Sequence, residues 1–256
     1  MIGTLVKVQR MFEDSCLGAG YTLDVLVRAF LQMGRVRHKR RELLDQLVLC
    51  TLGSLGVVFI ISLFTGMIVS LQTGITLQQW GQEARLGFIV SVGMCREMGP
   101  VFTCLTLAGL VGSTYAAEIG TMKVSEEVDA LEVMSIDPIY YLVMPRVIAL
   151  GVAAVALTIY SDLIGTLGGA LVAKSRFGVD LGIFLKNAQD ALVLKDIYGG
   201  LGKSLVFGVT IAAVACSQGL RAGQGAAGVG QATLRAVVIS FIFLLLFDYL
   251  LTWMLY

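Results

Sequence analysis

The sequence is poor in charge, proline and histidine, and its cysteines follow no regular spacing. Its 256 residues include 3 prolines, 1 histidine and 5 cysteines, and only 14% are charged. The cysteines form no CxxC pair, so we interpret them as small apolar residues within helices. With one histidine, and no Ser/His/Asp arrangement, neither a metal site nor an enzymatic role is expected for this chain. The net charge of +1 argues against nucleic-acid binding.

Apolar residues dominate instead. They make up 57% of the chain, and the mean hydropathy is +0.83. These values indicate an all-α integral membrane protein. The 30 glycines are typical of closely packed membrane helices. The row Gly165-x-x-x-Gly169, and a second row formed by Gly109, Ser113 and Ala117, predict close helix crossings or self-association.

Five apolar runs are long enough to span about 30 Å of hydrocarbon. We place them at 47–72, 86–117, 141–173, 199–220 and 233–255. Basic residues precede the first run, which predicts a cytoplasmic N-terminus; they are Arg35, Arg37, Lys39, Arg40 and Arg41. An odd number of spans puts the C-terminus on the other side. No cleavable signal peptide is expected, because the first apolar run starts only near Leu47.

The first 46 residues form a separate region, ahead of a transmembrane domain at 47–256. Apolar side chains recur there in steps of three and four, at Leu5, Val8, Phe12, Cys16, Ala19, Leu23, Leu26, Phe30 and Met33. This pattern predicts an amphipathic helix, followed by a basic connector. We favour a helix lying flat in the cytoplasmic interface of the membrane. The alternative is a helix packed on the chain's own loops.

A short acidic segment separates the second and third runs. Between residues 118 and 137 there are six acidic residues and one lysine. Ser125 is the expected N-cap of a helix of about ten residues within 124–136, too short to be stable alone in water. Asp137-Pro138 should end it, since the residue before proline avoids the α region. An acidic helix with a small apolar face suits a basic groove on a partner protein; the alternative is a solvated connector.

We single out four ionisable residues inside the predicted spans: Arg96, Glu97, Lys203 and Asp248. A charge at the centre of the bilayer costs about 2.5–3.5 kcal/mol on insertion scales, so these groups should not face lipid. Two readings stay open. The four groups pair with one another and lock helices together, or they line a polar cavity where Arg96 and Lys203 meet an anionic headgroup.

Two glycine-rich stretches resemble nucleotide-binding motifs without matching them. Gly199-Gly-Leu-Gly-Lys-Ser204 has Ile197 where the P-loop requires glycine, and no strand precedes it. Gly223-Gln-Gly-Ala-Ala-Gly228 lacks a surrounding βαβ unit. We expect no cofactor in this chain, and any ATP that drives it should be bound by another subunit.

Several multi-residue blocks resemble one family. They are Arg-Glu-Met-Gly-Pro (96–100), Ala-Ala-Glu-Ile-Gly-Thr-Met-Lys-Val (116–124), Asp-Ala-Leu-Glu-Val-Met (129–134), Asp-Pro (137–138), Pro-Arg (145–146), Gly-Leu-Arg-Ala (219–222) and Gly-Val-Gly-Gln-Ala-Thr (228–233). In this order and spacing they look like the MlaE/YrbE permeases of lipid-transporting, MCE-associated ABC systems. The resemblance runs from about residue 50 to the end. Leu110 and Ser135 depart from it, where arginine and glycine are common.

The resemblance implies a homodimeric permease in the bacterial inner membrane, with its C-terminus in the periplasm. Implied partners are cytoplasmic ATPase subunits that hold ATP and Mg, a periplasmic MCE-domain protein and often a STAS-domain protein. The implied substrate is phospholipid, moved between inner and outer membrane. The segment 124–136 would be the coupling helix, touching the ATPase through Lys123, Glu126, Glu127, Val128, Asp129, Leu131 and Glu132. The family's charged cavity residues map onto Arg96, Glu97, Lys203 and Asp248.

Two further expectations remain. Phe64, Met67 and Leu71 of the first span are predicted to line the acyl chains of a bound lipid. The alternative function is an ion-coupled secondary transporter that uses Glu97 and Asp248 as proton sites. The inverted repeat of many such transporters is not evident in the sequence, which counts against it.

Overall fold

The computed structural model describes Gly18, residues 20–32 and residues 39–256, and within these residues it contains helices and no strand. A helix at 20–31 comes first. The remaining elements are α2 (Arg40–Gln78), η2 (Glu83–Arg85), α3 (Leu86–Gly93), η3 (Met94–Met98), α4 (Gly99–Leu107), η4 (Ala108–Gly112), α5 (Ser113–Val124), α6 (Glu127–Val133), η5 (Ile139–Val143), α7 (Met144–Phe177), α8 (Leu181–Ala191), α9 (Leu194–Leu220) and α10 (Gly225–Leu255). The segments η3, η4 and η5 are π-helical turns, and η2 is a 3-10 turn.

Five helical stretches are long and apolar enough to cross a membrane: Arg40–Gln78, Glu83–Val124, Ile139–Phe177, Leu194–Leu220 and Gly225–Leu255. Each contains one of the predicted spans, so the all-α membrane class and the five spans are confirmed. The helices extend beyond the predicted limits. The 39 residues of α2 reach about 58 Å, which exceeds the thickness of the hydrocarbon layer.

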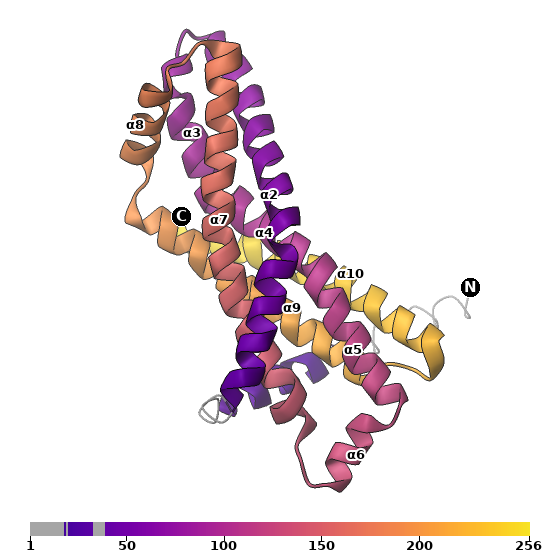
Figure 1. Ribbon diagram of the computed structural model, residues 1–256. Helices are drawn as coiled ribbons and strands as arrows, with labels where there is room; N and C mark the ends of the chain where they lie inside the picture. The colour runs from indigo at the N-terminus through magenta and orange to yellow at the C-terminus, as the bar shows by residue number, and fades with distance from the viewer. Residues whose placement is uncertain (1–17, 19, 33–38) are drawn as a thin grey trace, which may run out of the picture.

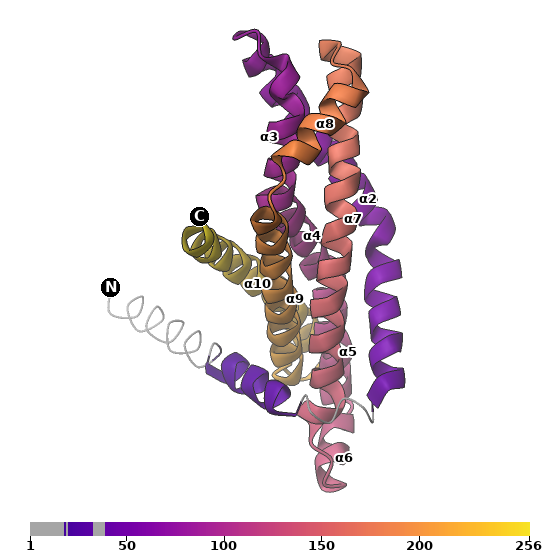
Figure 2. The same cartoon turned by 90° about the vertical axis from the view of Figure 1, so that its left-hand side faces the viewer.

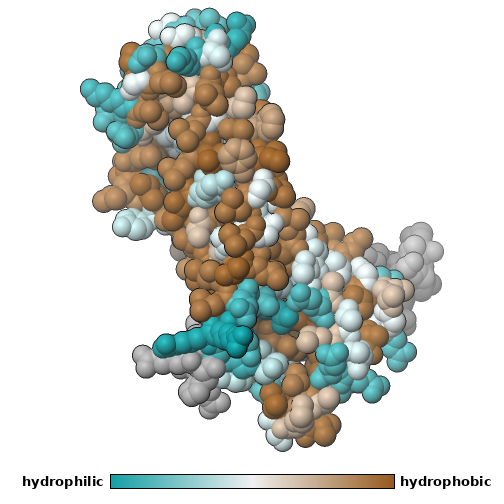
Figure 3. All heavy atoms as spheres, viewed as in Figure 1, coloured by the Kyte–Doolittle hydropathy of each residue, from teal (hydrophilic) through white to brown (hydrophobic). Residues whose placement is uncertain are grey.

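The long helices α2 and α7 lie side by side along most of their length (Figures 1 and 2). At one end of this pair lie α3 and α8, and at the other end lies α6. The C-terminus of α10 ends near mid-height. Apolar residues cover the face between a polar cap over α3 and α8 and a polar region toward α6 (Figure 3). This distribution matches a protein that crosses a membrane between those two ends.

Small residues allow α2 and α7 to approach closely. A Cβ atom at Gly66 would overlap the carbonyl oxygen of Gly165. Ser62 Oγ donates a hydrogen bond of 2.7 Å to Ser161 Oγ, and Ser70 Oγ donates one of 2.8 Å to the carbonyl oxygen of Gly169. The predicted crossing at Gly165 and Gly169 therefore exists. The row at Gly109, in contrast, faces outward, with nothing within 4 Å of a Cβ built there.

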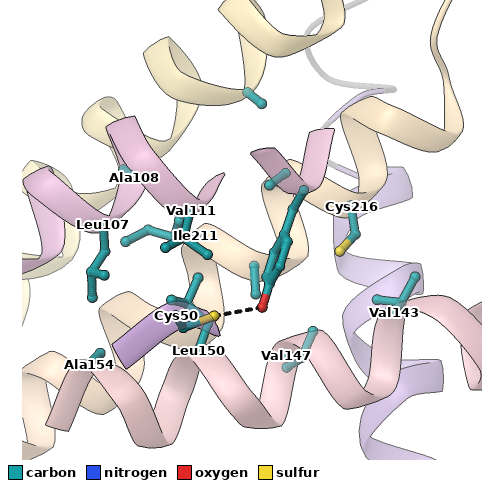
Figure 4. Packing of buried hydrophobic residues seen from close by; sticks show 14 of the residues in the cluster. Cys50, Leu107, Ala108, Val111, Val143, Val147, Leu150, Ala154, Ile211 and Cys216 are labelled. Atoms are coloured by element: carbon teal, nitrogen blue, oxygen red, sulfur yellow. Dashed lines mark hydrogen bonds between the residues drawn. The ribbon is translucent and has the colours of Figure 1, made fainter. Parts of the chain in front are cut away.

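The main core fills the space between α2, α5, α7 and α9. At its centre the ring of Tyr115, from α5, is completely buried. Its hydroxyl lies 2.9 Å from Cys50 Sγ on α2, and Leu150 and Ile211 pack nearby (Figure 4). A buried phenol requires a hydrogen-bonding partner, and the thiol of Cys50 provides one.

The helix at 20–31 carries apolar residues on two sides. Val25 and Ala29 are buried against the core, and Thr22 Oγ1 lies 2.8 Å from Ser217 Oγ of α9. A second apolar row remains exposed, formed by Leu23, Val27, Phe30 and Leu31. The helix thus packs on the body of the protein and still presents an apolar stripe. The rest of the predicted N-terminal helix and part of the basic connector, at 1–17, 19 and 33–38, lie outside the described residues.

Two local predictions were wrong. Ser125 does not cap α6: the helix α5 runs on to Val124, Ser125 ends it by donating to the carbonyl oxygen of Thr121, and Glu126 precedes α6 with φ 62°. The helix also ends earlier than predicted: α6 stops at Val133, and Ser135 with φ 60° turns the chain before Asp137-Pro138, so α6 spans seven residues. The helix α8 was not predicted. Its signal was Asp180, whose carboxylate accepts a 2.8 Å hydrogen bond from the N–H of Gly182 at the helix start.

We expect Gly66→Ala to destabilise the protein, by about 1–3 kcal/mol or more, because the added methyl group overlaps Gly165 of α7. Gly53→Ala is the matched control on the same helix, since nothing lies within 4 Å of a Cβ there. The measurement is the thermal unfolding midpoint of both variants in detergent. Equal midpoints would contradict the close α2–α7 contact.

Candidate functional site

The four charged residues predicted inside the spans come together around Lys203. Its side chain is fully buried, and its Nζ donates to Glu97 Oε2 at 2.8 Å and to Asp248 Oδ1 at 3.0 Å. It also contacts Thr252 Oγ1 at 2.6 Å and the carbonyl oxygen of Arg96 at 3.2 Å. Glu97 belongs to η3, Lys203 to α9, and Asp248 and Thr252 to α10. One ammonium group therefore holds three helices together.

The contact between Lys203 and the backbone depends on Pro100. In a regular α-helix the carbonyl oxygen of Arg96 accepts from the N–H of residue 100. Proline has no N–H, so this acceptor loses its usual partner. Lys203 Nζ donates to it instead. The Arg-Glu-Met-Gly-Pro block thus supplies both a carboxylate and a free backbone acceptor to one lysine.

The second cation, Arg96, has a carboxylate of its own. Its Nε donates a 2.8 Å hydrogen bond to Asp196 Oδ1, and its guanidinium lies 4.4 Å from the centre of the Tyr256 ring. Asp196 sits in the first turn of α9 and is 2% exposed. We did not predict Asp196 or Thr252 from the sequence. The available signal for Asp196 was helical spacing, since residue 196 lies two turns before Lys203 on the same face.

The five charged groups of this cluster comprise two cations and three carboxylates: Arg96 and Lys203, with Glu97, Asp196 and Asp248. The side chain of Lys203 is fully buried, whereas the side chains of Arg96, Glu97 and Asp248 are 39%, 30% and 21% exposed. Mutual pairing, the first of the two readings, is therefore observed. An approaching ligand would meet the guanidinium and the two carboxylates but not the ammonium. Contact with a headgroup stays a prediction.

The apolar residues predicted to line acyl chains lie elsewhere. Phe64 and Leu71 are exposed on α2, and Met67 is half-buried there. The helix α2 packs chiefly along α7, while the charged cluster is built from η3, α9 and α10. Within one chain the structure does not bring these side chains to the charges.

The helix α6 presents an acidic surface with an apolar edge. Lys123 Nζ pairs with Asp129 Oδ1 at 2.6 Å, and Ser125 Oγ donates to Glu127. Val128 is buried beneath the helix and Leu131 is half-buried. Within the described residues no cation pairs with three of the acidic side chains, which are Glu126, Glu127 and Glu132. Val133 and Met134 are 86% and 60% exposed, although both are apolar.

An ion pair joins the two helices that lead into and out of the α6 segment. Arg146, at the start of α7, donates from Nη2 to Glu118 Oε2 at 2.9 Å and from Nη1 to the carbonyl oxygen of Leu142 at 2.9 Å. Its guanidinium lies 5.4 Å from the ring centre of Tyr115. The Pro-Arg block and the acidic block therefore meet where α5 enters and α7 leaves the α6 loop. This contact ties α5 to α7, the two helices that flank α6 in the chain.

Comparisons with known proteins agree with these features. A family model described as "Permease MlaE" matches residues 43–254. A probable ABC transporter permease protein of Synechocystis sp. is 39% identical over 238 residues, covering 90% of each chain. A probable ABC transporter permease protein of Rickettsia typhi is 40% identical over 214 residues, covering 84% of this chain and 83% of the relative.

A plant protein is also similar. The chloroplastic protein TRIGALACTOSYLDIACYLGLYCEROL 1 of Arabidopsis thaliana is 38% identical over 212 residues, which cover 83% of this chain and 61% of the plant protein.

We expect Lys203→Met to destabilise the protein by about 3–5 kcal/mol, because it leaves Glu97 and Asp248 close together without their cation. Lys195→Met is the matched control, since Lys195 is an exposed lysine on the same helix. Thermal unfolding in detergent measures the difference. A loss no larger than that of the control would show that the cluster does not hold the helices together.

Proposed function

The chain belongs to the MlaE permease family of ABC transporters, and from this premise we propose that it moves phospholipids between the inner and outer membrane. ATP hydrolysis would occur on a separate ATPase subunit that holds ATP and Mg. The observation that carries the lipid proposal is the half-exposed charged cluster of Arg96, Glu97 and Asp248, set between membrane-spanning helices. A phospholipid combines a charged headgroup with apolar chains, and such a surface offers both environments.

Arg96 is the cation best placed to hold a lipid phosphate. Among the described residues its guanidinium makes one hydrogen bond to protein, through Nε, and this leaves the Nη donors for a ligand. An arginine fork binds phosphate in a bidentate manner. Glu97 and Asp248 lie on the same cluster and suit an amine of the headgroup. The relative named after a galactolipid also favours a glycerolipid substrate.

The ATPase would dock on α6. Its acidic side chains and the exposed Val133 and Met134 form a small surface with an apolar edge, which suits a basic groove with an apolar floor. The pair between Arg146 and Glu118 would pass a displacement of α6 to α5 and α7. Closure of two ATPase subunits around ATP would in this way move the membrane helices.

The remaining assembly follows the family expectation. We propose a homodimer in the bacterial inner membrane, with a periplasmic MCE-domain protein above it and a STAS-domain protein on the ATPase. The N-terminus and α6 would lie on the cytoplasmic side and the C-terminus on the periplasmic side. The helix at 20–31 would rest in the cytoplasmic interface, with its exposed row of Leu23, Val27 and Phe30 among the lipids.

An ion-coupled transporter built on Glu97 and Asp248 receives less support. Lys203 pairs with both carboxylates, so each has a cation within hydrogen-bonding distance, and the single positive charge balances one of the two negative charges. A reconstituted complex separates the two functions. ATP should drive movement of labelled phospholipid between vesicles that carry the donor and acceptor components, and a protonophore without ATP should have no such effect. Transport that persists without the ATPase would overturn the proposal.

We expect Arg96→Gln to lower ATP-driven phospholipid transport roughly tenfold or more, since a hydrogen bond to a charged group contributes about 1.5–3 kcal/mol. ATPase binding should be retained, because α6 is unchanged. Lys195→Gln serves as the control for loss of a nearby positive charge. Normal transport by Arg96→Gln would reject the headgroup role.

We expect the double variant Glu127→Lys with Glu132→Lys to lose the ATPase, because it reverses the charge of the docking surface. Asp129 is left intact, since it pairs with Lys123 within the chain. Glu83→Lys, at the start of the helical stretch Glu83–Val124 and remote from α6, is the control. Co-purification of the ATPase and the ATP turnover of the complex are the readouts; unchanged values would remove α6 from the interface.

A further inference from the structure

Asp162, in the third spanning helix, has no place in the charged cluster. Asp162 is the only Asp, Glu, Lys or Arg between residues 147 and 173 of α7. It lies near the middle of the third spanning helix, which runs from Ile139 to Phe177. A carboxyl group at this depth is costly in its ionised form, so its surroundings decide its protonation state.

The packing around Asp162 leaves one oxygen of its carboxyl without a donor, and the one side chain that bonds the carboxyl is the thiol of Cys95, a weak donor. Its Oδ1 atom is buried and has no hydrogen-bond partner. This oxygen lies directly over Gly99, where a Cβ atom would overlap it. Gly99 is the first residue of α4 and follows the π-helical turn η3. Glycine at this position is therefore what allows the carboxyl of α7 to reach the backbone of α4.

No free cation faces this carboxyl from the elements that pack on α7. The stretch 47–78 of α2, the whole of α3 and the whole of α4 contain no charged residue, and the titratable group of α4 is the buried thiol of Cys104. From η3 come Cys95, Arg96 and Glu97, and from α9 come Lys195, Asp196 and Lys203. Arg96 and Lys203 are already held by other carboxylates, and the exposed Lys195, in the first turn of α9, lies 5.3 Å from the centre of the Tyr256 ring. The helix α8, which carries Lys186 and Asp190, lies at the end of the molecule away from α6 (Figure 1).

We propose that Asp162 is a proton-binding site: its carboxyl holds a proton while α4 packs against α7, and releases it when the two helices separate. The proton is required in the packed arrangement because an ionised Oδ1 would be buried with neither a donor nor a cation. Separation of α4 from α7 admits water to the same oxygen and allows ionisation. The proton passes to water on separation and returns from water on closure.

The direction of the effect on pH follows from this linkage. The packed state binds one more proton than the separated state, so rising pH favours separation of α4 from α7. Since α4 continues from η3, which carries Glu97, the proton would bias the position of the charged cluster. The site adds a proton-linked step to the cycle and does not depend on which substrate the permease moves.

Labelling with dicyclohexylcarbodiimide tests the protonation state directly, using the full chain in lipid vesicles. This apolar reagent adds to protonated carboxyls: the acid proton moves to a carbodiimide nitrogen, the carboxyl oxygen bonds to the central carbon, and the acyl group then migrates to nitrogen as a stable N-acylurea. Mass spectrometry locates the adduct. Asp162 is half-buried, so the reagent can reach it from the lipid.

We expect the adduct on Asp162 to exceed that on Asp248, a carboxylate paired with Lys203 in the same domain, by about tenfold or more. The adduct should decline as the pH is raised, and Asp162→Asn should abolish it. Equal labelling of the two aspartates, or labelling of Asp162 only by a water-soluble carbodiimide, would overturn the proposal.

Thermal unfolding gives an independent readout. Asparagine resembles the protonated carboxyl in shape and charge, so Asp162→Asn should unfold at the parent temperature under mildly acidic conditions. At alkaline pH the variant should unfold at a higher temperature than the parent, whose packed state loses its proton there. A variant as unstable as Asp196→Asn at every pH would show that Asp162 is an ionised structural residue, and would contradict the assignment.

Discussion

The arrangement of the helices depends on one buried ammonium group. Lys203 has no exposed side-chain surface, and every contact of its Nζ goes to another element: η3 through Glu97 and the carbonyl of Arg96, and α10 through Asp248 and Thr252. An unpaired charge at this depth is costly, so the three elements must meet where Lys203 stands. The apolar surfaces of α9 and α10 alone would allow them to slide or rotate. The lysine fixes their register, and Pro100 completes the site by leaving a backbone acceptor unfilled.

Much of the fold could be predicted from composition and hydropathy, because the membrane imposes a strong constraint. Backbone groups in hydrocarbon must bond within their own segment, so a long apolar run is a helix. This reasoning placed all five spans correctly. It failed where tertiary contacts outside the apolar runs decide the structure. The helix α8 is amphipathic and short, and the end of α5 depends on how Ser125 bonds backward to Thr121.

The charged cluster was predictable in its members but not in its pairing. The cost of charge in hydrocarbon singled out Arg96, Glu97, Lys203 and Asp248, and the structure gathers all of them. The same argument could not show that Asp196 pairs with Arg96. Asp196 lies just before the predicted span, where a charged residue carries no insertion cost. Asp162 was missed for a different reason. It is a single acid in a long apolar helix, and only the packing against Gly99 shows that nothing neutralises it.

One continuous helical stretch connects the charged cluster to α6, the two proposed working parts of the molecule. From Glu83 to Val124 the chain passes through η2, α3, η3, α4, η4 and α5 without a loop. Glu97 sits in this stretch, and α6 follows directly after its end. The π-helical turns η3 and η4 interrupt the regular hydrogen bonding at Met94–Met98 and Ala108–Gly112, and such turns are common at functional sites. A displacement of α6 would therefore be transmitted along the helical stretch, and the change in backbone geometry would be concentrated at these two turns. The turn η3 carries Arg96 and Glu97, and it is followed by Gly99, which packs against Asp162. Bending at η3 would therefore move the charged cluster and the contact with the unpaired carboxyl oxygen together.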